Sequence, residues 1–289
     1  MQYSETVVKA ADGTELFARH CRTSRSDSAP TVLVVHGACE HGERYEHVVE
    51  ALAEQGCDSI VTDLRGHGRS QGVPMHVRRF DEYVSDLDSL QRHFNLAPER
   101  TVLLGHSMGG LISIRYCQKH PEAVQALVLI SPLLRLAVHV PRLTVAVGRV
   151  LSHVAPRTRF RSRVDPRDTT RNLQAVAARL NDPQLRRSVT ASWYFATQRA
   201  LVEAWREAPA LQLPVLLLQA GDDRIVCPQA PAEWVTRLSS TDASCQVLPD
   251  SLHELLNEPE WPETIEQISE WMKLRLDAGP LSPAGRCSA

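Results

Sequence analysis

A serine stands between two glycines where a predicted strand gives way to a predicted helix. The sequence reads Gly105-His106-Ser107-Met108-Gly109, after the apolar run 101–104 and before a helical stretch from Leu111. In so sharp a turn, side chains two positions from the serine would collide with it, and glycine removes those collisions. The turn exposes the hydroxyl at a helix N-terminus, where free N–H groups and the dipole favour negative charge. Ser107 is therefore the predicted nucleophile.

A serine hydroxyl needs a base to remove its proton, and a histidine base needs an acid to fix its tautomer. The predicted strand 215–219 runs into a glycine turn with Asp222 and Asp223, and His253 stands in a loop before the last predicted helix. Each residue alone is commonly an ordinary turn or surface residue. In the chain order serine, acid, histidine they predict a triad of Ser107, Asp223 and His253. Asp223 is favoured because it lies two residues past the glycine, and Asp222 is the alternative.

The tetrahedral intermediate of such a reaction needs two N–H donors for its oxyanion. One is predicted to be the amide of Met108, the residue after the nucleophile. The other should come from the turn after an earlier strand, where the sequence reads His36-Gly37-Ala38. Glycine lets the backbone approach a substrate there. The Ala38 amide is the predicted second donor.

The elements that must hold these residues follow from the apolar pattern of the chain. Residues 5–22 alternate around Asp12-Gly13, which indicates a hairpin. Apolar runs predict strands at 31–35, 59–63, 101–104, 126–130, 215–219 and, more weakly, 245–248. Amphipathic segments predict helices at 45–55, 80–96, 111–120, 231–239 and 260–276. Strands that are apolar on both faces and alternate with helices indicate a parallel sheet covered on both sides. No G-x-G-x-x-G follows a strand, which disfavours a dinucleotide-binding fold.

One long segment breaks the alternation. Between 132 and 208 no strand-like run occurs, so about 75 residues separate two strands that a single helix could join. We predict an α/β core (1–133 and 209–277), an inserted helical cap (134–208) and a flexible tail (278–289). The cap has 14 arginines, no lysine and 5 acidic residues, roughly +9, against roughly −11 for the remainder. This charge indicates either a solvated face or a surface that approaches anionic lipid.

Composition excludes several classes of protein. A formal net charge of −2 disfavours a nucleic-acid binder. No apolar stretch reaches the roughly 18 residues of a membrane span, and the N-terminus does not resemble a signal peptide. Seven scattered cysteines without a C-x-x-C pair predict reduced thiols and no zinc site. We expect a cytoplasmic protein that can contact membranes peripherally through the arginine-rich cap, and the oligomeric state stays open.

Further motifs surround the predicted site. They are His36-Gly37-Ala38-Cys39-Glu40-His41-Gly42-Glu43-Arg44-Tyr45, Asp63-Leu64-Arg65-Gly66-His67-Gly68-Arg69-Ser70, Gly105-His106-Ser107-Met108-Gly109-Gly110, Ser131-Pro132-Leu133, Asp223-Arg224 and His253-Glu254-Leu255-Leu256-Asn257-Glu258. With them the chain resembles the α/β-hydrolase superfamily and, within it, the monoacylglycerol lipase/lysophospholipase family of serine aminopeptidase S33-like hydrolases. The resemblance covers nearly the whole chain except the first residues, the cap interior and the tail.

The resemblance implies the α/β-hydrolase fold, a mostly parallel central sheet flanked by helices, with a mobile helical cap over an apolar acyl channel. It also implies serine-dependent hydrolysis of a lipid monoester without cofactor or metal. The residues that match Glu40 and Arg44 lie near the alcohol side of the pocket in such enzymes, so these two are candidate substrate-binding residues. An ion pair that braces the oxyanion loop is the other interpretation of them.

Two departures from the family pattern bear on the substrate. Leu256 stands where monoglyceride lipases carry a second histidine, and Cys39 replaces the glycine common after the oxyanion alanine. These departures weaken the case for monoacylglycerol and leave lysophospholipids or simple esters open. From the resemblance we expect a carboxylic ester hydrolase (EC 3.1.1) that acts on monoacylglycerol or lysophospholipid through an acyl-enzyme. A short-chain carboxylesterase and an acyltransferase are the enzymatic alternatives. A ligand-binding or catalytically silent protein on the same fold is the alternative outside enzymes.

Overall fold

A central sheet organises the computed structural model, which describes residues 1–23, 29–162 and 164–276. Within these residues the sheet has eight strands in the order β1-β2-β4-β3-β5-β6-β9-β10. They are β1 (Gln2–Lys9), β2 (Glu15–Arg22), β3 (Thr31–Val35), β4 (Asp58–Thr62), β5 (Thr101–His106), β6 (Ala126–Ile130), β9 (Val215–Ala220) and β10 (Ala243–Leu248). The β1–β2 hairpin is antiparallel, β2 pairs antiparallel with β4, and all pairs from β4 onward are parallel. The predicted mostly parallel sheet is confirmed.

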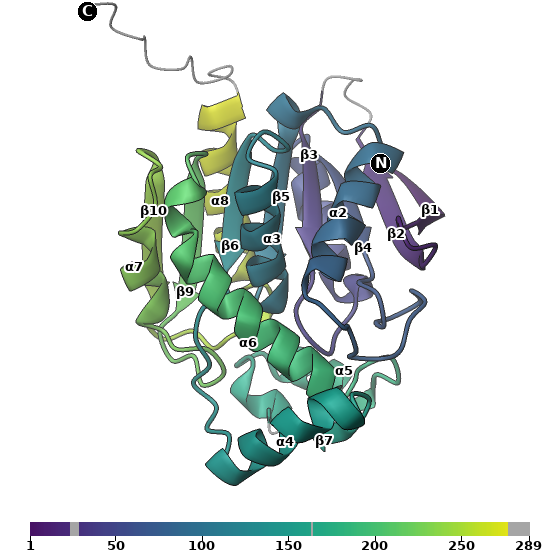
Figure 1. Cartoon of the computed structure of the whole chain (residues 1–289). Helices are drawn as coiled ribbons and strands as arrows, with labels where there is room; N and C mark the ends of the chain where they lie inside the picture. The colour runs from purple at the N-terminus through teal and green to yellow at the C-terminus, as the bar shows by residue number, and fades with distance from the viewer. Residues whose placement is uncertain (24–28, 163, 277–289) are drawn as a thin grey trace, which may run out of the picture.

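Helices cover both faces of the sheet because its strands are apolar on both sides. In β3, Val32 and Val34 pack into one buried cluster while Leu33 and Val35 pack into the other. The first cluster is closed by α1 (Glu46–Glu54) and α8 (Trp261–Leu276). The second is closed by α2 (Asp81–His93), α3 (Met108–Lys119), α6 (Ala191–Arg206) and α7 (Ala230–Val235) (Figure 1).

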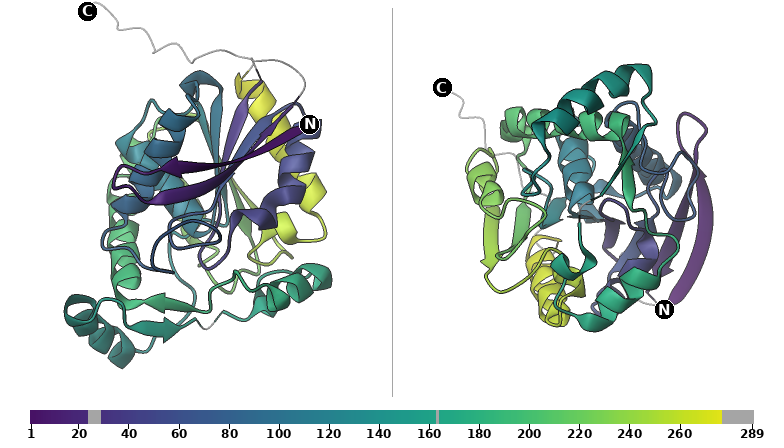
Figure 2. Two further views of the ribbon diagram at one scale, coloured as in Figure 1. Left: turned by 90° about the vertical axis from the view of Figure 1, so that its right-hand side faces the viewer. Right: turned by 90° about the horizontal axis from the view of Figure 1, so that it is seen from below.

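The inserted segment lies beyond the end of the sheet at which β5 passes into α3 (Figure 1). Its elements are α4 (Arg142–Val154), β7 (Arg159–Arg161), α5 (Leu173–Asn181) and β8 (Ser188–Thr190). In the left view of Figure 2 the two helices lie on either side of a short ribbon formed by β7 and β8. The sequence analysis predicted a helical insertion and did not foresee this ribbon. Three residues a strand are too few to produce a recognisable alternation in the sequence.

The helix α6 lies wholly within the predicted cap, 134–208, but only part of it packs like a cap element. Its second half packs on α3, and the Ala204 carbonyl accepts hydrogen bonds from Gln118 Nε2 at 3.0 Å and from Trp234 Nε1 at 3.1 Å. The first half of α6 packs instead against α4. The division at residues 134–208 stays a prediction, and the packing assigns the second half of α6 to the core. The predicted tail, 278–289, lies outside the described residues.

Three helix ends differ from the sequence prediction by three or more residues, and one of them is the end of α2, at His93 rather than 96. The helix α3 begins at Met108 rather than Leu111, and α7 ends at Val235 rather than near 239. Gly109 and Gly110 are poor helix formers, so local propensity hides the first turn of α3, which the surrounding packing fixes. Among the described residues, none of the helices is both long enough and apolar enough to cross a bilayer.

Candidate active site

Ser107 occupies the turn between β5 and α3 with a backbone φ of 53°, a value that residues other than glycine rarely adopt. The glycines on either side of Ser107 are required because any larger side chain there would clash with neighbouring atoms. A Cβ on Gly109 would lie 2.0 Å from the Val35 carbonyl oxygen, and one on Gly105 would lie 2.5 Å from Ser113 Oγ. The sequence therefore folds here into a turn that only this spacing of small residues allows, with Ser107 directly before α3.

His253 and Asp223 form a buried pair. His253 Nδ1 lies 2.7 Å from Asp223 Oδ2, and Asp223 Oδ1 accepts hydrogen bonds from the amides of Ile225 and Val226, both at 2.9 Å. Burial alone would raise the pKa of Asp223, but His253 and these two amides hold it below its usual value. Asp222 is exposed. The geometry brings His253 together with Asp223, as predicted, and leaves Asp222 in solvent.

Ser107 and His253 face one pocket. Both residues line it, and the His253 ring lies 4.9 Å, centroid to centroid, from the ring of His106, the residue before Ser107. With its Nδ1 atom held by Asp223, the imidazole is left with Nε2 to act as a base. The three predicted triad residues thus come from three separate chain segments to one place.

The predicted oxyanion loop follows β3, which is the strand next to β5 in the sheet. Cys39 has a φ of 66°, and the Gly37 amide donates to Glu40 Oε1 at 2.5 Å, which folds the loop back on itself. Among the described residues, neither the Ala38 nor the Met108 amide donates a hydrogen bond to another group of the chain. Two amides without an internal acceptor, one from the residue after the nucleophile and one from the loop after β3, are what an oxyanion requires.

Glu40 and Arg44 are part of a buried network and not simple pocket polar groups. Arg44 Nη1 lies 2.5 Å from Glu40 Oε2, and Arg44 Nη2 lies 2.7 Å from Glu254 Oε2. Glu40 Oε1 also accepts from the Tyr45 hydroxyl at 2.9 Å, and Arg179 pairs with Glu254 from the cap. Glu40 lines the pocket whereas Arg44 does not. These contacts favour the second interpretation above, an ion pair that braces the oxyanion loop.

The charges in this network hold each carboxylate ionised. Burial would raise the pKa of Glu40, but the Arg44 guanidinium and His106 hold it well below its usual range. In the same way, Arg44 and Arg179 overcome burial and lower the pKa of Glu254 to about 2. Burial raises the pKa of the neighbouring Cys39 thiol to about 12, so the thiol stays protonated at neutral pH. Cys39 therefore lines the pocket as a protonated thiol.

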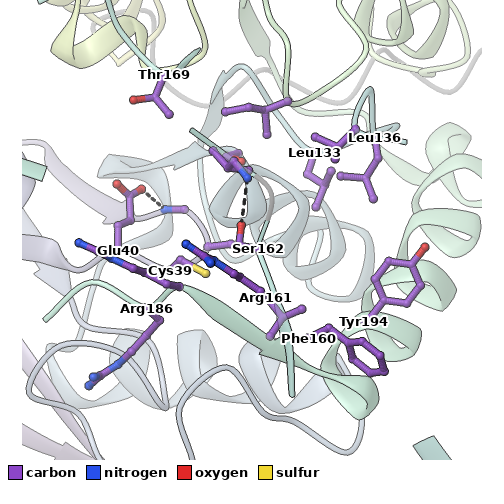
Figure 3. Close-up of a pocket in the computed structure, with 18 of the residues that line it drawn as sticks. Cys39, Glu40, Leu133, Leu136, Phe160, Arg161, Ser162, Thr169, Arg186 and Tyr194 are labelled. Atoms are coloured by element: carbon purple, nitrogen blue, oxygen red, sulfur yellow. Dashed lines mark hydrogen bonds between the residues drawn. The ribbon is translucent and has the colours of Figure 1, made fainter. Parts of the chain in front are cut away.

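The pocket has a volume of about 550 Å³ and is divided by polarity. In Figure 3, Leu133, Leu136 and Tyr194 lie on one side of it, and Cys39 and Glu40 lie on the other. Its walls come both from the core loops that carry Ser107 and His253 and from the inserted segment. A cavity of this size and division suits a small molecule with an apolar part and a polar part.

Sequence reasoning did not single out the individual pocket residues of the inserted segment. Arg161, Arg179 and Arg186 line the pocket, together with Phe160 and Tyr194. For the arginines, the signal in the sequence was their excess across the segment, and for Phe160 and Tyr194 there was none. That signal gives the sign of the charge but not the direction of any side chain.

Comparison with known proteins agrees with this geometry. Residues 26–260 match the family model described as serine aminopeptidase, S33. Human monoglyceride lipase is 33% identical over 94% of this chain and 92% of its own length. A phospholipase of Bacillus subtilis is 31% identical, over 79% of this chain and 89% of its own length. The crystal structure of Paleococcus ferrophilus monoacylglycerol lipase superposes with a TM-score of 0.83 at 29% identity, covering 90% of this chain and 99% of the lipase.

One relative is much longer. The chain spans 26% of an uncharacterized abhydrolase domain-containing protein of Dictyostelium discoideum, at 29% identity. The fold and the strained turn that carries Ser107 between β5 and α3 define an α/β-hydrolase. The chain belongs to the serine aminopeptidase S33 family of these enzymes, in which its relatives include the monoglyceride lipases. It is a carboxylic ester hydrolase.

Proposed function

We propose that this protein hydrolyses esters of single-chain lipids, monoacylglycerol or lysophospholipid, through an acyl-enzyme on Ser107. The observation that carries the proposal is the pocket of about 550 Å³, which joins an apolar side to a buried pair of His253 and Asp223. The names of the relatives, monoglyceride lipase and phospholipase, support the same substrate class.

In the proposed mechanism, His253 removes the proton from the Ser107 hydroxyl as the oxygen attacks the ester carbonyl. Asp223 keeps the Nδ1 proton of the imidazole in place and stabilises the imidazolium. The Ala38 and Met108 amides bind the oxyanion, and each such donor contributes roughly 3–4 kcal/mol in the transition state. His253 then protonates the leaving alcohol. Water, activated in the same way, releases the fatty acid and restores the serine.

An acyltransferase would share every one of these residues, because an alcohol would replace water in the second half of the reaction. A general carboxylesterase would differ in the pocket alone, being unable to accept a long acyl chain. A silent binding protein on this fold would need to lack a competent triad. The buried hydrogen bond between His253 and Asp223 supports an enzyme over a binding protein.

Peripheral membrane contact through the cap is part of the proposal. Leu143, Val147, Val150 and Val154 are exposed on α4 at helical spacing and so share one face. Arginines of the same segment would add attraction to anionic headgroups. Liposome binding should fall when Val147 and Val150 are both changed to aspartate, and should weaken with salt. Liposome binding that responds to neither change would favour the alternative interpretation, in which the charged face of the cap is simply solvated. We also propose a cytoplasmic location, supported by six described cysteines that are all free thiols.

The experiment that tests the proposed function is a substrate panel. It compares 1- and 2-monoacylglycerols, lysophosphatidylcholine and p-nitrophenyl esters of increasing chain length, each with wild type and Ser107→Ala. Hydrolysis should be greatest on long-chain lipids and absent from the variant. Activity confined to short esters would identify a general carboxylesterase instead of a lipase. Transfer of the acyl group to added glycerol would indicate an acyltransferase.

A further inference from the structure

Four arginines of the inserted segment line the pocket without a counter-charge. They are Arg161, Arg167, Arg186 and Arg187. Among the described residues, none of their guanidinium groups forms an ion pair, whereas Arg171 and Arg179 of the same segment pair with Glu258 and Glu254. Unpaired guanidinium groups that gather at a concave site, and not on an open surface, point to an anionic ligand.

Among these four arginines, Arg186 provides the strongest evidence for a ligand. Its backbone amide donates to the Cys39 carbonyl at 3.0 Å, so the residue lies against the oxyanion loop. Its Nε atom is buried and has no hydrogen-bond partner among the described residues. A buried donor without an acceptor costs free energy, and a ligand that supplies the acceptor recovers it.

The carboxylates of the pocket do not cancel this charge. Glu40 and Glu254 are neutralised by Arg44 and Arg179, as described above. Asp165, the remaining acidic residue of the pocket wall, accepts a hydrogen bond from the Arg167 amide at 2.9 Å and forms no ion pair in the described chain. Positive charge therefore exceeds negative charge along the wall.

The positions of Arg161 and Arg186 indicate which part of a bound ester they would face. In Figure 3, Arg161 and Arg186 lie on the side of Cys39 and Glu40, apart from Leu136 on the apolar side. An acyl chain would occupy the apolar side, and the carbonyl would lie at the oxyanion loop. The alcohol portion of the ester then faces the two arginines.

We propose that the pocket takes a single-chain lipid ester whose alcohol portion carries a phosphate, and that Arg161 and Arg186 bind this phosphate. The proposal rests on the proposed function, because it names the substrate class of that same site. The guanidinium fork matches two phosphate oxygens, and the half-buried Arg186 is better shielded from water than the exposed Arg161. The reaction is ordinary hydrolysis: water and the ester give a fatty acid and an alcohol phosphate.

The test compares octanoylglycerol 3-phosphate with octanoylglycerol, which differ only in the phosphate. The measured quantity is the ratio of kcat/KM for the anionic ester to that for the neutral ester. In wild type the ratio should exceed one, and Arg161→Gln with Arg186→Gln should lower it by about 10- to 100-fold, since two charged hydrogen bonds are lost. The control is Arg199→Gln, an exposed arginine of α6 outside the pocket, which removes one positive charge and should leave the ratio unchanged.

A wild-type ratio of one or less, or an equal fall in the Arg199→Gln control, would overturn the proposal. A second measurement separates a headgroup from a free anion. Glycerol 3-phosphate should compete with p-nitrophenyl butyrate much more strongly than inorganic phosphate does, and equal competition would contradict the substrate assignment. If p-nitrophenyl butyrate is hydrolysed in a Ser107-dependent way while the ratio fails, only this inference falls. If the enzyme hydrolyses neither p-nitrophenyl butyrate nor either octanoyl ester, the proposed function itself falls.

Discussion

Glu40→Gln removes one buried negative charge while keeping the size of the side chain. The carboxylate holds Arg44 at 2.5 Å, the Gly37 amide at 2.5 Å and the Tyr45 hydroxyl at 2.9 Å, and it is 2% exposed. Breaking a buried ion pair costs about 3–5 kcal/mol, and Arg44 retains Glu254, so we expect the lower end, about 3 kcal/mol. That corresponds to a fall in Tm of roughly 6 °C for a chain of this length.

The matched control is Glu46→Gln. Glu46 lies 2.5 Å from Arg19, the same separation as in the buried pair, but its side chain is 59% exposed. An exposed pair is screened by water, so this variant should lose less than about 1 kcal/mol. Urea unfolding followed by tryptophan fluorescence measures both variants. Glu40→Gln should also lower kcat, because the loop that carries the Ala38 amide loses its brace.

Equal unfolding midpoints for the two variants would refute the bracing role of Glu40. A raised KM with unchanged stability and unchanged kcat would instead support Glu40 as a direct contact for the alcohol portion of the substrate. The two interpretations of Glu40 and Arg44 therefore give opposite results in one pair of assays.

Four further predictions follow from the same geometry. Asp223→Asn should lower kcat about 10³–10⁴-fold because it disturbs the imidazole tautomer, whereas the exposed neighbour in Asp222→Asn should retain wild-type kcat; the reverse order in steady-state assays would exchange their roles. Gly109→Ala should prevent folding, seen as loss of soluble protein and of near-UV circular dichroism, because the new Cβ would meet backbone 2.0 Å away; a folded, active variant would contradict this. Cys39 should react slowly with iodoacetamide at pH 8, judged by peptide mass spectrometry, since its thiol pKa is raised to about 12, and alkylation as fast as that of a free thiol would be the contrary result. Glu254 has a folded-state pKa of about 2 against 4.5 when unfolded, so its contribution to stability is full above pH 4.5 and is lost as the pH falls toward 2; a Glu254→Gln variant should show a smaller loss in acid urea titrations, and an identical loss would argue against it.

How much the sequence could predict depended on how local each signal was. The elbow at Ser107 was predictable because a short run of glycines and one serine determines it, and the parallel strands were predictable because each is an unbroken apolar run. The ribbon of β7 and β8 was not, since its pairing of Arg159 with Thr190 joins residues far apart in the chain and leaves no pattern. The network of Arg44 with Glu254 was likewise out of reach, because 210 positions separate the two residues.

Contacts between residues far apart in the chain also explain why the roles of the pocket arginines could not be predicted. The arginine excess of the inserted segment was visible in the sequence, but pairing decides what each arginine does. Arg179 is neutralised by Glu254, whereas Arg186 faces the pocket unpaired, and only the folded chain separates these two cases.

The most direct test of the central claim is covalent labelling with a fluorophosphonate, followed by peptide mass spectrometry. The account predicts one adduct, on the peptide that contains Ser107, together with loss of mono-oleoylglycerol hydrolysis in proportion to labelling. An unlabelled protein that still hydrolyses the lipid, or a label on another residue with activity lost, would contradict it.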